Sequence, residues 1–196
     1  MILTRAEVSD LDRLLQFRRD AAAWLAPLGT DQWSLPFPAE NIARSIQAGE
    51  VYIVRESPES EAAATITLDE EADPLLWTEA ERMDPALYVH KLTVDRRWGG
   101  QRLGERLLDW AGTQASSRGA RWLRLDAWTT NTRLHRYYEE LGFHWLRTVT
   151  DPAVGGSGWV AQRPAVPADH GLVEAVHATD ARREPRPPTH GRQDCP

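Results

Sequence analysis

Apolar side chains recur at the spacing of a helix in several parts of the chain. The clearest is the segment 103–117, where leucine or alanine at positions 103, 107, 108, 111 and 115 forms one apolar face. The same spacing, with proline, glycine or cap residues at the ends, predicts helices over 10–25, 39–49 and 131–141. Each of these helices would bury one face against a common core.

Between the helices the pattern changes to short β-prone runs. Strands are expected over 1–6, 50–55, 62–68, 87–94, 122–128, 143–150 and 158–163, and the acidic segment 69–85 is expected to be a loop. The first half of this order is rich in hairpins and the second half reads βαβαβ. This order predicts an α+β fold with a mixed sheet rather than a doubly wound parallel one.

The composition changes near the C-terminus. Trp159 is the last aromatic residue, and the segment 164–196 holds six of the thirteen prolines. A segment without large apolar groups cannot offset the entropy lost on ordering. We therefore expect one domain over 1–163 and a mostly disordered tail, rich in proline and arginine, over 164–196.

Charge and cysteine content exclude several classes of protein. The 29 acidic and 23 basic residues give a net charge of −6, which argues against a nucleic-acid partner. No apolar run is long enough to cross a membrane, and the single Cys195 excludes a disulfide framework and a cysteine-rich zinc site, so no metal site is predicted. The first residues reach charge too early for a secretory signal, which favours a cytoplasmic location.

A glycine-rich turn joins the predicted strand 87–94 to the helix that begins at 103. A turn of this kind presents unpaired backbone N–H groups and the positive end of a helix dipole to an anion, so it predicts a phosphate site. Such a turn can also simply reverse the chain. It lacks the Gly-Lys-Ser/Thr of a P-loop and the glycine spacing of a dinucleotide fingerprint.

Three features together resemble the GCN5-related N-acetyltransferase (GNAT) superfamily. They are the strand 90–94 leading into 98–108, the strand 123–127 followed by Asn131, and the segment 138–143, which reads Tyr-Glu-Glu-Leu-Gly-Phe. The resemblance covers roughly 1–163 and is most specific over 87–143. It implies the acyl-CoA N-acyltransferase fold, a mixed and mostly antiparallel central sheet flanked by helices.

The resemblance also implies a binding site for acetyl-CoA. The residues that it assigns to the cofactor are Leu92, Thr93, Val94, Gly99, Gly100, Gln101, Arg102, Leu103, Gly104 and Asn131. In the family pattern Gln/Arg-x-x-Gly-x-Gly/Ala, Gly99 replaces a polar residue and Arg102 replaces a glycine. We expect the amides of 99–104 to hold the pyrophosphate with an ordinary helical backbone at Arg102. Its guanidinium, with those of Arg96 and Arg97, would add positive charge.

Acetylation of an amine needs a group that removes a proton. An amine with a pKa of about 10.4 is neutral in only about one molecule per thousand near neutral pH, a cost of roughly 4 kcal/mol. His90 is the first candidate base, because some members of the superfamily carry a catalytic histidine on this strand, and it is expected to share a face with Leu92 and Val94. Asp126 is the second, since strand alternation places it opposite the apolar set. For both residues a purely structural role remains open.

The remaining roles also follow from the resemblance. Tyr138 would protonate the departing thiolate, while Asn131 would either cap its helix or reach the pantetheine amides. Gln32, Trp33 and Phe37 would wall the acceptor pocket, with the acidic run 69–73 at its rim.

The implied activity is transfer of an acetyl group from acetyl-CoA to a primary amine of a small molecule or peptide, by direct attack in a ternary complex. A non-catalytic acyl-CoA-binding module and a transferase of another acyl group remain the alternatives, and a homodimer is left open.

Overall fold

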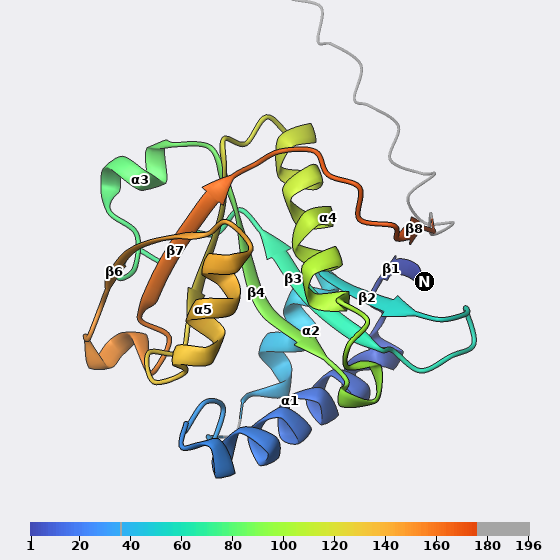
Figure 1. The fold of residues 1–196 in the computed structure, drawn as a ribbon. Helices are drawn as coiled ribbons and strands as arrows, with labels where there is room; N and C mark the ends of the chain where they lie inside the picture. Colours follow the sequence, from blue (N-terminus) through green and yellow to red (C-terminus); the bar gives the residue numbers. More distant parts are fainter. Residues whose placement is uncertain (36, 176–196) are drawn as a thin grey trace, which may run out of the picture.

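A mixed β-sheet forms the centre of the computed structural model, which describes residues 1–35 and 37–175 (Figure 1). Within these residues the sheet has eight strands in the order β6-β7-β5-β4-β3-β2-β1-β8. They are β1 (Ile2–Arg5), β2 (Val51–Arg55), β3 (Ala64–Asp69), β4 (Ala86–Val94), β5 (Trp122–Ala127), β6 (His144–Thr148), β7 (Trp159–Pro164) and β8 (Val173–Glu174). The β4–β5 and β1–β8 pairs are parallel and the others antiparallel, so the predicted mixed sheet is confirmed.

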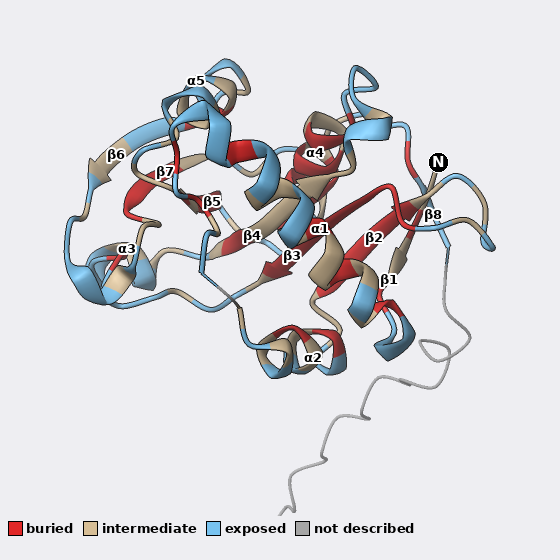
Figure 2. Ribbon diagram, turned by 90° about the horizontal axis from the view of Figure 1, so that it is seen from below, coloured by how far each residue is buried: buried red, intermediate tan, exposed pale blue. Residues whose placement is uncertain are grey.

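Helices cover both faces of the sheet (Figures 1 and 2). The helices are α1 (Leu11–Leu25), α2 (Ala39–Gln47), α3 (Glu79–Met83), α4 (Leu103–Ser117) and α5 (Thr132–Glu140). The main core packs α4 and α5 on one face, and a second core packs α1 and α2 on the other. In the part of the chain described, no helix combines the length and apolar character that crossing a bilayer requires.

Helix α3 lies in the segment that was expected to be a loop. Thr78 accepts a hydrogen bond from the backbone N–H of Glu81, and the Glu81 carboxylate accepts one from the backbone N–H of Thr78. This reciprocal capping box is readable in the sequence as Thr-x-x-Glu. The acidic composition of the segment led to the prediction of a loop, although its capping residues favour a short helix.

A β-bulge in β4 changes which side chains face which helix layer. The pairing of β3 with β4 shifts register at this point, and Lys91 has a left-handed φ of 53°. Leu92 and Val94 pack against the main core, whereas His90 pairs with Thr67 on the opposite face of the sheet. The expectation that His90 shares a face with Leu92 and Val94 is therefore wrong, because the bulge inserts one residue and reverses the alternation.

Strands β4 and β5 separate at one end. They pair from Ala86 with Trp122 to Val89 with Leu125, although β4 continues to Val94. The backbone of β4 beyond Val89 is therefore free of β5 on that side. The opening faces the N-terminus of α4 and the start of α5.

The ordered domain extends past residue 163, where its end was expected. Leu172 is buried in the main core, and β8 adds to the free edge of β1 through backbone bonds from Val173 to Met1 and from Ala175 to Leu3. The side chain of Arg106 also donates to the backbone of the same segment. Composition did not predict this contact, because pairing with an edge strand uses backbone N–H and C=O groups and depends little on the side chains. The rest of the predicted tail, 176–196, lies outside the described residues.

Removing residues 165–196 should lower the melting temperature, whereas removing only 176–196 should leave it unchanged. The chain that ends at residue 164 loses the burial of Leu172, which is worth about 1.5–3 kcal/mol of stability. In a domain of this size, this loss lowers the melting temperature by roughly 3–10 °C. Thermal unfolding of both truncated chains followed by circular dichroism checks the difference. Equal melting temperatures would show that 165–175 contributes nothing to stability.

Candidate functional site

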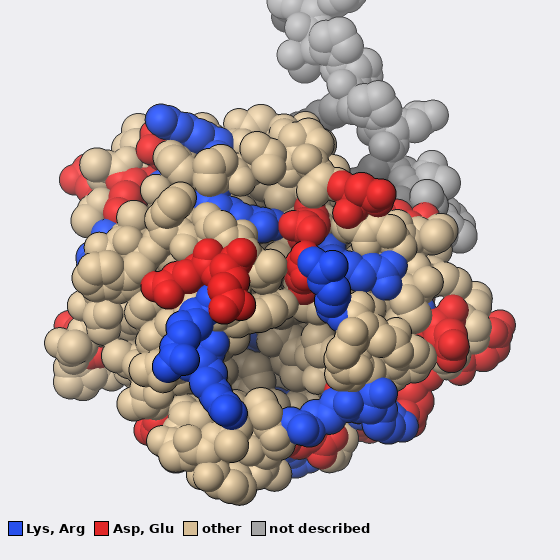
Figure 3. All heavy atoms as spheres, viewed as in Figure 1, with Lys and Arg blue, Asp and Glu red and all other residues tan. Residues whose placement is uncertain are grey.

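A cleft of about 630 Å³ lies where β4 and β5 separate, between α1, the end of β4 and the start of α5. Its walls include five of the residues predicted for the cofactor, namely Leu92, Thr93, Val94, Gly99 and Asn131, together with the predicted acceptor residues Gln32 and Trp33. Figure 3 shows this face hollowed between α5 and α1, with basic side chains along part of the rim. Arg13, Arg96 and Arg97 are the basic residues that line the cleft. The fold thus joins residues from three distant segments in one cleft.

A smaller pocket of about 280 Å³ adjoins the cleft at the N-terminus of α4. Its walls include the predicted residues Gly100, Arg102, Leu103 and Gly104 and, from α5, Tyr137 and Tyr138. Gln101 lines neither cavity and lies on the outer side of the turn, beside Arg97 and Trp98. The two cavities share Leu92, Val94, Gly99 and Leu134, so a long ligand that follows β4 could occupy both.

The turn before α4 has an unusual backbone. Gly100 has a φ of 81°, and Arg102, directly before the first helical residue, has a φ of 56° and a ψ of 25°. The expectation of an ordinary helical backbone at Arg102 is therefore wrong. Left-handed backbone costs a non-glycine residue roughly 1–2 kcal/mol, and glycine adopts it freely. The turn keeps a shape suited to the glycine of the family pattern, although the residue is arginine.

The basic side chains of this turn already have partners. Arg102 pairs with Glu105, with 2.6 Å between Nε and the carboxylate, and Arg97 lies 2.7 Å from Asp95. Arg96, whose guanidinium lies 4.2 Å from the ring centre of Trp24, lines the large cleft. Their expected contribution to phosphate binding stays a prediction, and Arg96 is best placed for it.

Helix α5 packs closely against the start of α4. A Cβ atom at Gly104 would lie 2.6 Å from the hydroxyl oxygen of Tyr137, so a larger residue at this position would require Tyr137 to move. Tyr138, the next residue, is buried with its ring against Phe143 and Trp159. Burial raises the pKa of Tyr138 well above its usual range, and Tyr137 and Asp126 act in the same direction. Tyr138 therefore keeps its proton throughout the physiological pH range.

Asn131 links the start of α5 to the loop between α1 and α2. Its side-chain oxygen accepts a bond from the backbone N–H of Leu134 at 3.1 Å, and its amide nitrogen donates to Gln32 at 2.7 Å. In the same loop, Asp31 accepts a bond from the indole of Trp128 at 2.7 Å. The capping role of Asn131 is present, and its predicted contact with pantetheine stays a prediction.

His90 lies between two carboxylates contributed by the neighbouring strands. Its Nε2 is 3.3 Å from Oδ1 of Asp69 on β3, and its Nδ1 is 3.6 Å from Oδ1 of Asp126 on β5. Burial alone would lower the pKa of His90, but the interactions with Asp126 and Asp69 outweigh it and raise the pKa to about 9. His90 is therefore protonated at neutral pH.

Asp69 was not singled out from the sequence except as part of the acidic run. A sharper signal was available, because Thr65, Thr67 and Asp69 alternate with the buried Ile66 and Leu68 along β3. That alternation places Asp69 on the same face as the residue with which Thr67 pairs, which is His90. On β5, Asp126 alternates in the predicted way with core residues Leu125 and Ala127.

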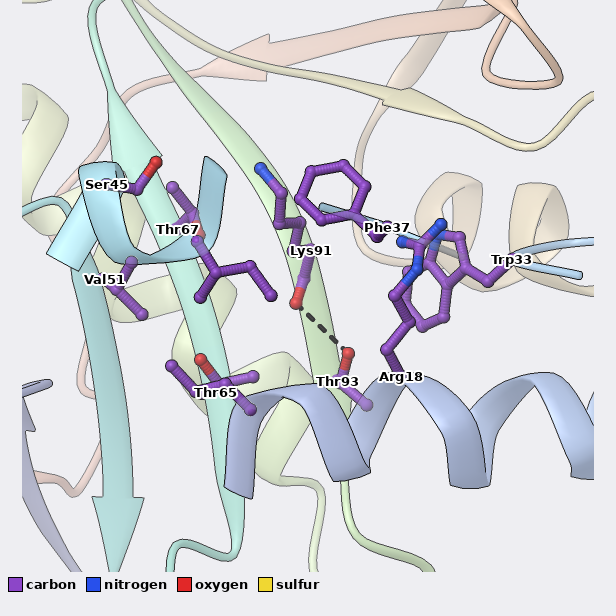
Figure 4. A pocket seen from close by; sticks show the side chains of 11 residues that line it. Arg18, Trp33, Phe37, Ser45, Val51, Thr65, Thr67, Lys91 and Thr93 are labelled. Carbon is purple, nitrogen blue, oxygen red and sulfur yellow. Dashed lines mark hydrogen bonds between the residues drawn. The ribbon is translucent and has the colours of Figure 1, made fainter. Parts of the chain in front are cut away.

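A narrow pocket lies on this face of the sheet, under α1 and α2 (Figure 4). The predicted residues Trp33 and Phe37 line it, with Arg18 and Lys91, two residues that the sequence did not suggest. The ring of Phe37 lies between the two cations, 4.7 Å from the guanidinium carbon of Arg18 and 5.4 Å from Nζ of Lys91. Gln32 lies apart on the large cleft. Trp33 lines both cavities, whereas Phe37 lines only the narrow pocket and Gln32 only the large cleft.

Comparisons with known proteins agree on one family. The family model described as the acetyltransferase (GNAT) family matches residues 18–143. A protein from Bacillus subtilis (strain 168) described as the uncharacterized N-acetyltransferase YesJ is 32% identical over 131 residues, which are 64% of this chain and 71% of that protein.

Solved structures show the same fold. A GNAT-family acetyltransferase from Listeria monocytogenes superposes with a TM-score of 0.68 at 23% identity, covering 83% of this chain and 94% of that one. The PaiA N-acetyltransferase from Thermoplasma acidophilum, solved in complex with coenzyme A, gives a TM-score of 0.61 at 16% identity, covering 83% and 97%. With a family model that matches well over half of its length, the chain belongs to the GNAT family of N-acetyltransferases.

Proposed function

We propose that this protein transfers an acetyl group from acetyl-CoA to a primary amine of a small molecule or peptide, by direct attack in a ternary complex. The observation that carries the proposal is the continuity of the site along β4. Leu92 and Val94 line both cavities that lead to the turn before α4. His90 with its two carboxylates precedes them on the same strand, on the other face of the sheet, at the point where β4 and β5 separate. A cofactor bound with its phosphates at the turn could follow β4 and bring its thioester close to these charges.

The solved relative with coenzyme A supports the choice of cofactor. Of the predicted amides 99–104, that of Gly99 donates to the carbonyl oxygen of Arg96. The backbone amides of 100–104 would hold the pyrophosphate, since no side chain caps the N-terminus of α4. Arg96 would add charge from the cleft wall. The acetyl donor is inferred from the family description as acetyltransferases.

Asp126 is the residue that we propose as proton acceptor. Both ring nitrogens of His90 face carboxylates, and an imidazolium has no lone pair for an amine proton. The Asp126 carboxylate has oxygen lone pairs that can accept a proton, and one of its oxygens lies 3.6 Å from Nδ1 of His90. In this proposal the amine nitrogen attacks the thioester carbonyl carbon, Asp126 takes the amine proton, directly or through a water, and His90 positions the carboxylate.

Tyr138 is proposed to stabilise the departing thiolate. When the C–S bond breaks, the electron pair goes to sulfur, whose pKa of about 8.5 as a thiol lies far below the raised pKa of Tyr138. Full proton transfer from the phenol would therefore be uphill. A hydrogen bond from the tyrosine hydroxyl to the sulfur is the favourable interaction, with water completing the protonation.

Replacing Tyr138 by phenylalanine should lower kcat by about tenfold to a hundredfold and leave the affinity for acetyl-CoA nearly unchanged. The ring still packs, and only one hydrogen bond to a charged group, worth about 1.5–3 kcal/mol, is lost. Steady-state kinetics and calorimetric titration of acetyl-CoA measure the two effects. Tyr137→Phe is the matched control, and a larger fall in kcat for that variant would transfer the role to Tyr137.

A thiol-release screen tests the proposed activity as a whole. Acetyl-CoA is supplied with a panel of primary amines and with their dimethylated tertiary counterparts, which cannot form a stable amide. We expect release only with primary amines, and faster release from acetyl-CoA than from longer acyl-CoAs. Binding of acetyl-CoA without release for any amine would favour the non-catalytic module, and a preference for a longer chain would favour another acyl group.

A further inference from the structure

Arg18 is a partly buried cation that has no anionic partner among residues 1–35 and 37–175. It lies on the inner side of α1, and none of the ion pairs found among the described residues includes it. Its Nε is buried and makes no hydrogen bond. Its guanidinium lies over the rings of Trp33, at 5.2 Å, and Phe37, at 4.7 Å. Aromatic rings hold its position but neutralise none of its charge, so the free energy cost of burying this cation is only partly offset.

The neighbouring charges cannot supply the missing anion. On the other side of Phe37, the cations His90 and Lys91 lie among the carboxylates of Asp69 and Asp126. Glu50 adds a third carboxylate that interacts with Lys91. Among the described residues, none of these three carboxylates forms an ion pair with Arg18. Figure 4 shows the guanidinium of Arg18 beside the indole of Trp33, with the ring of Phe37 between it and Lys91.

The loop that carries Trp33 is held in a strained conformation over Arg18. Trp33 has a φ of 62°, which is costly for a residue with a large side chain. The residues just before it hold the loop in place, because Gln32 accepts a bond from Asn131 and Asp31 accepts one from Trp128. Strain of this kind persists only where the surroundings impose it, and it is common at ligand sites.

We propose that the acceptor carries a carboxylate as well as its amine, and that Arg18 binds this carboxylate in the pocket beneath Trp33 and Phe37. The inference rests on the proposed function and names the substrate class, an amino carboxylic acid. The pocket has about 30 Å³ of free space, which suits a small planar group. It lies on the same face of the sheet as His90, since both Thr67, which pairs with His90, and Lys91 line it. The amine would then reach the Asp126 side of Phe37 while the carboxylate pairs with Arg18.

Calorimetric titration of the CoA-saturated protein tests this without requiring turnover. The probes are α-amino acids and ω-amino acids of increasing length, each paired with its primary carboxamide, which has the same shape without the charge. We expect at least one amino acid to bind about tenfold or more tightly than its amide, the size of effect that a charge-assisted hydrogen bond gives. Arg18→Gln should remove this preference and leave the affinity for the amide unchanged.

Two further variants keep the result interpretable. Arg19→Gln alters the neighbouring exposed arginine, whose guanidinium bonds to Gln16, and should retain the preference. Arg18→Lys keeps the positive charge and should retain part of the preference for the amino acid over its amide. The affinity of each variant for coenzyme A reports whether the variant is folded. Equal binding of acid and amide by the wild type, no binding of any amino acid, or a preference that survives Arg18→Gln would overturn the proposal. Arg18-dependent binding without thiol release would instead contradict the proposed transferase activity.

Discussion

Replacing Gly100 by aspartate should abolish the binding of acetyl-CoA. Gly100 lies in the turn before α4 and lines the pocket that the pyrophosphate would occupy. A Cβ atom there meets nothing within 4 Å, so the new side chain would enter open space at the turn without a steric clash. Its negative charge would then repel the phosphates and oppose the helix dipole. Such like-charge juxtaposition costs several kcal/mol, so we expect the affinity to fall by about a hundredfold or more.

Gly100→Asn is the matched control. Gly100 has a φ of 81°, and asparagine and aspartate tolerate this conformation to a similar degree, so the two variants differ mainly in charge. Calorimetric titration should show a modest loss for asparagine and no measurable binding for aspartate. If both variants bind acetyl-CoA as the wild type does, the phosphates do not lie at this turn. If both lose affinity equally, backbone strain rather than charge is responsible.

Replacing Asp126 by asparagine should lower kcat by about a hundredfold to ten-thousandfold, the usual contribution of a general base. Asparagine keeps the size of the side chain but cannot accept the amine proton. Asp69→Asn is the matched comparison, because Asp69 and Asp126 both face His90. Kinetics at saturating acetyl-CoA and amine should show a much smaller loss for Asp69→Asn. Equal losses would mean that both carboxylates act only through the charge of His90.

The pH dependence separates the two roles considered for His90. With a pKa of about 9, His90 is charged at neutral pH and loses its proton as the pH rises through about 9. If its charge positions Asp126, activity of the wild type should decline through this range relative to His90→Gln. If a neutral His90 were the base, the wild type would gain activity there relative to the variant. The sign of this difference, measured at saturating amine, decides between the roles.

The sequence predicted the helices well because their apolar spacing and end signals are local. The segment 103–117 shows this best, since α4 has the predicted bounds. The sequence did not correctly predict which side chains of β4 lie on the same face of the sheet. A single inserted residue, marked by the left-handed backbone of Lys91, placed His90 opposite Leu92 and Val94. Nothing in the local pattern of β-prone residues reports such a bulge, because it depends on how β3 pairs.

The motif at 99–104 could be proposed from the sequence because its residues are consecutive, and its role in binding phosphate stays a prediction. Contacts between distant segments could not be proposed in this way. In the sequence Arg18 is one more charge on a predicted helix, and only the folded chain shows that its buried Nε makes no hydrogen bond within the described part of the chain and that its guanidinium lies over Phe37. Asp69 reads as the start of an acidic loop, and its contact with His90 depends on strand register. Composition alone suggested that the chain beyond 163 is disordered, but the free edge of β1 orders its first part.

The central claim is that the acetyl group passes directly from acetyl-CoA to the amine. Locating the acetyl group during the reaction tests this claim. The wild-type protein is incubated with acetyl-CoA labelled in the acetyl group, first alone and then with an amine that supports thiol release, and both protein and small molecules are examined by mass spectrometry. We predict no label on the protein before the amine is added. We further predict that label appears on the amine nitrogen in equal amount to the thiol released. Labelled protein that passes its acetyl group to the amine, or thiol release without an amide product, would contradict direct transfer.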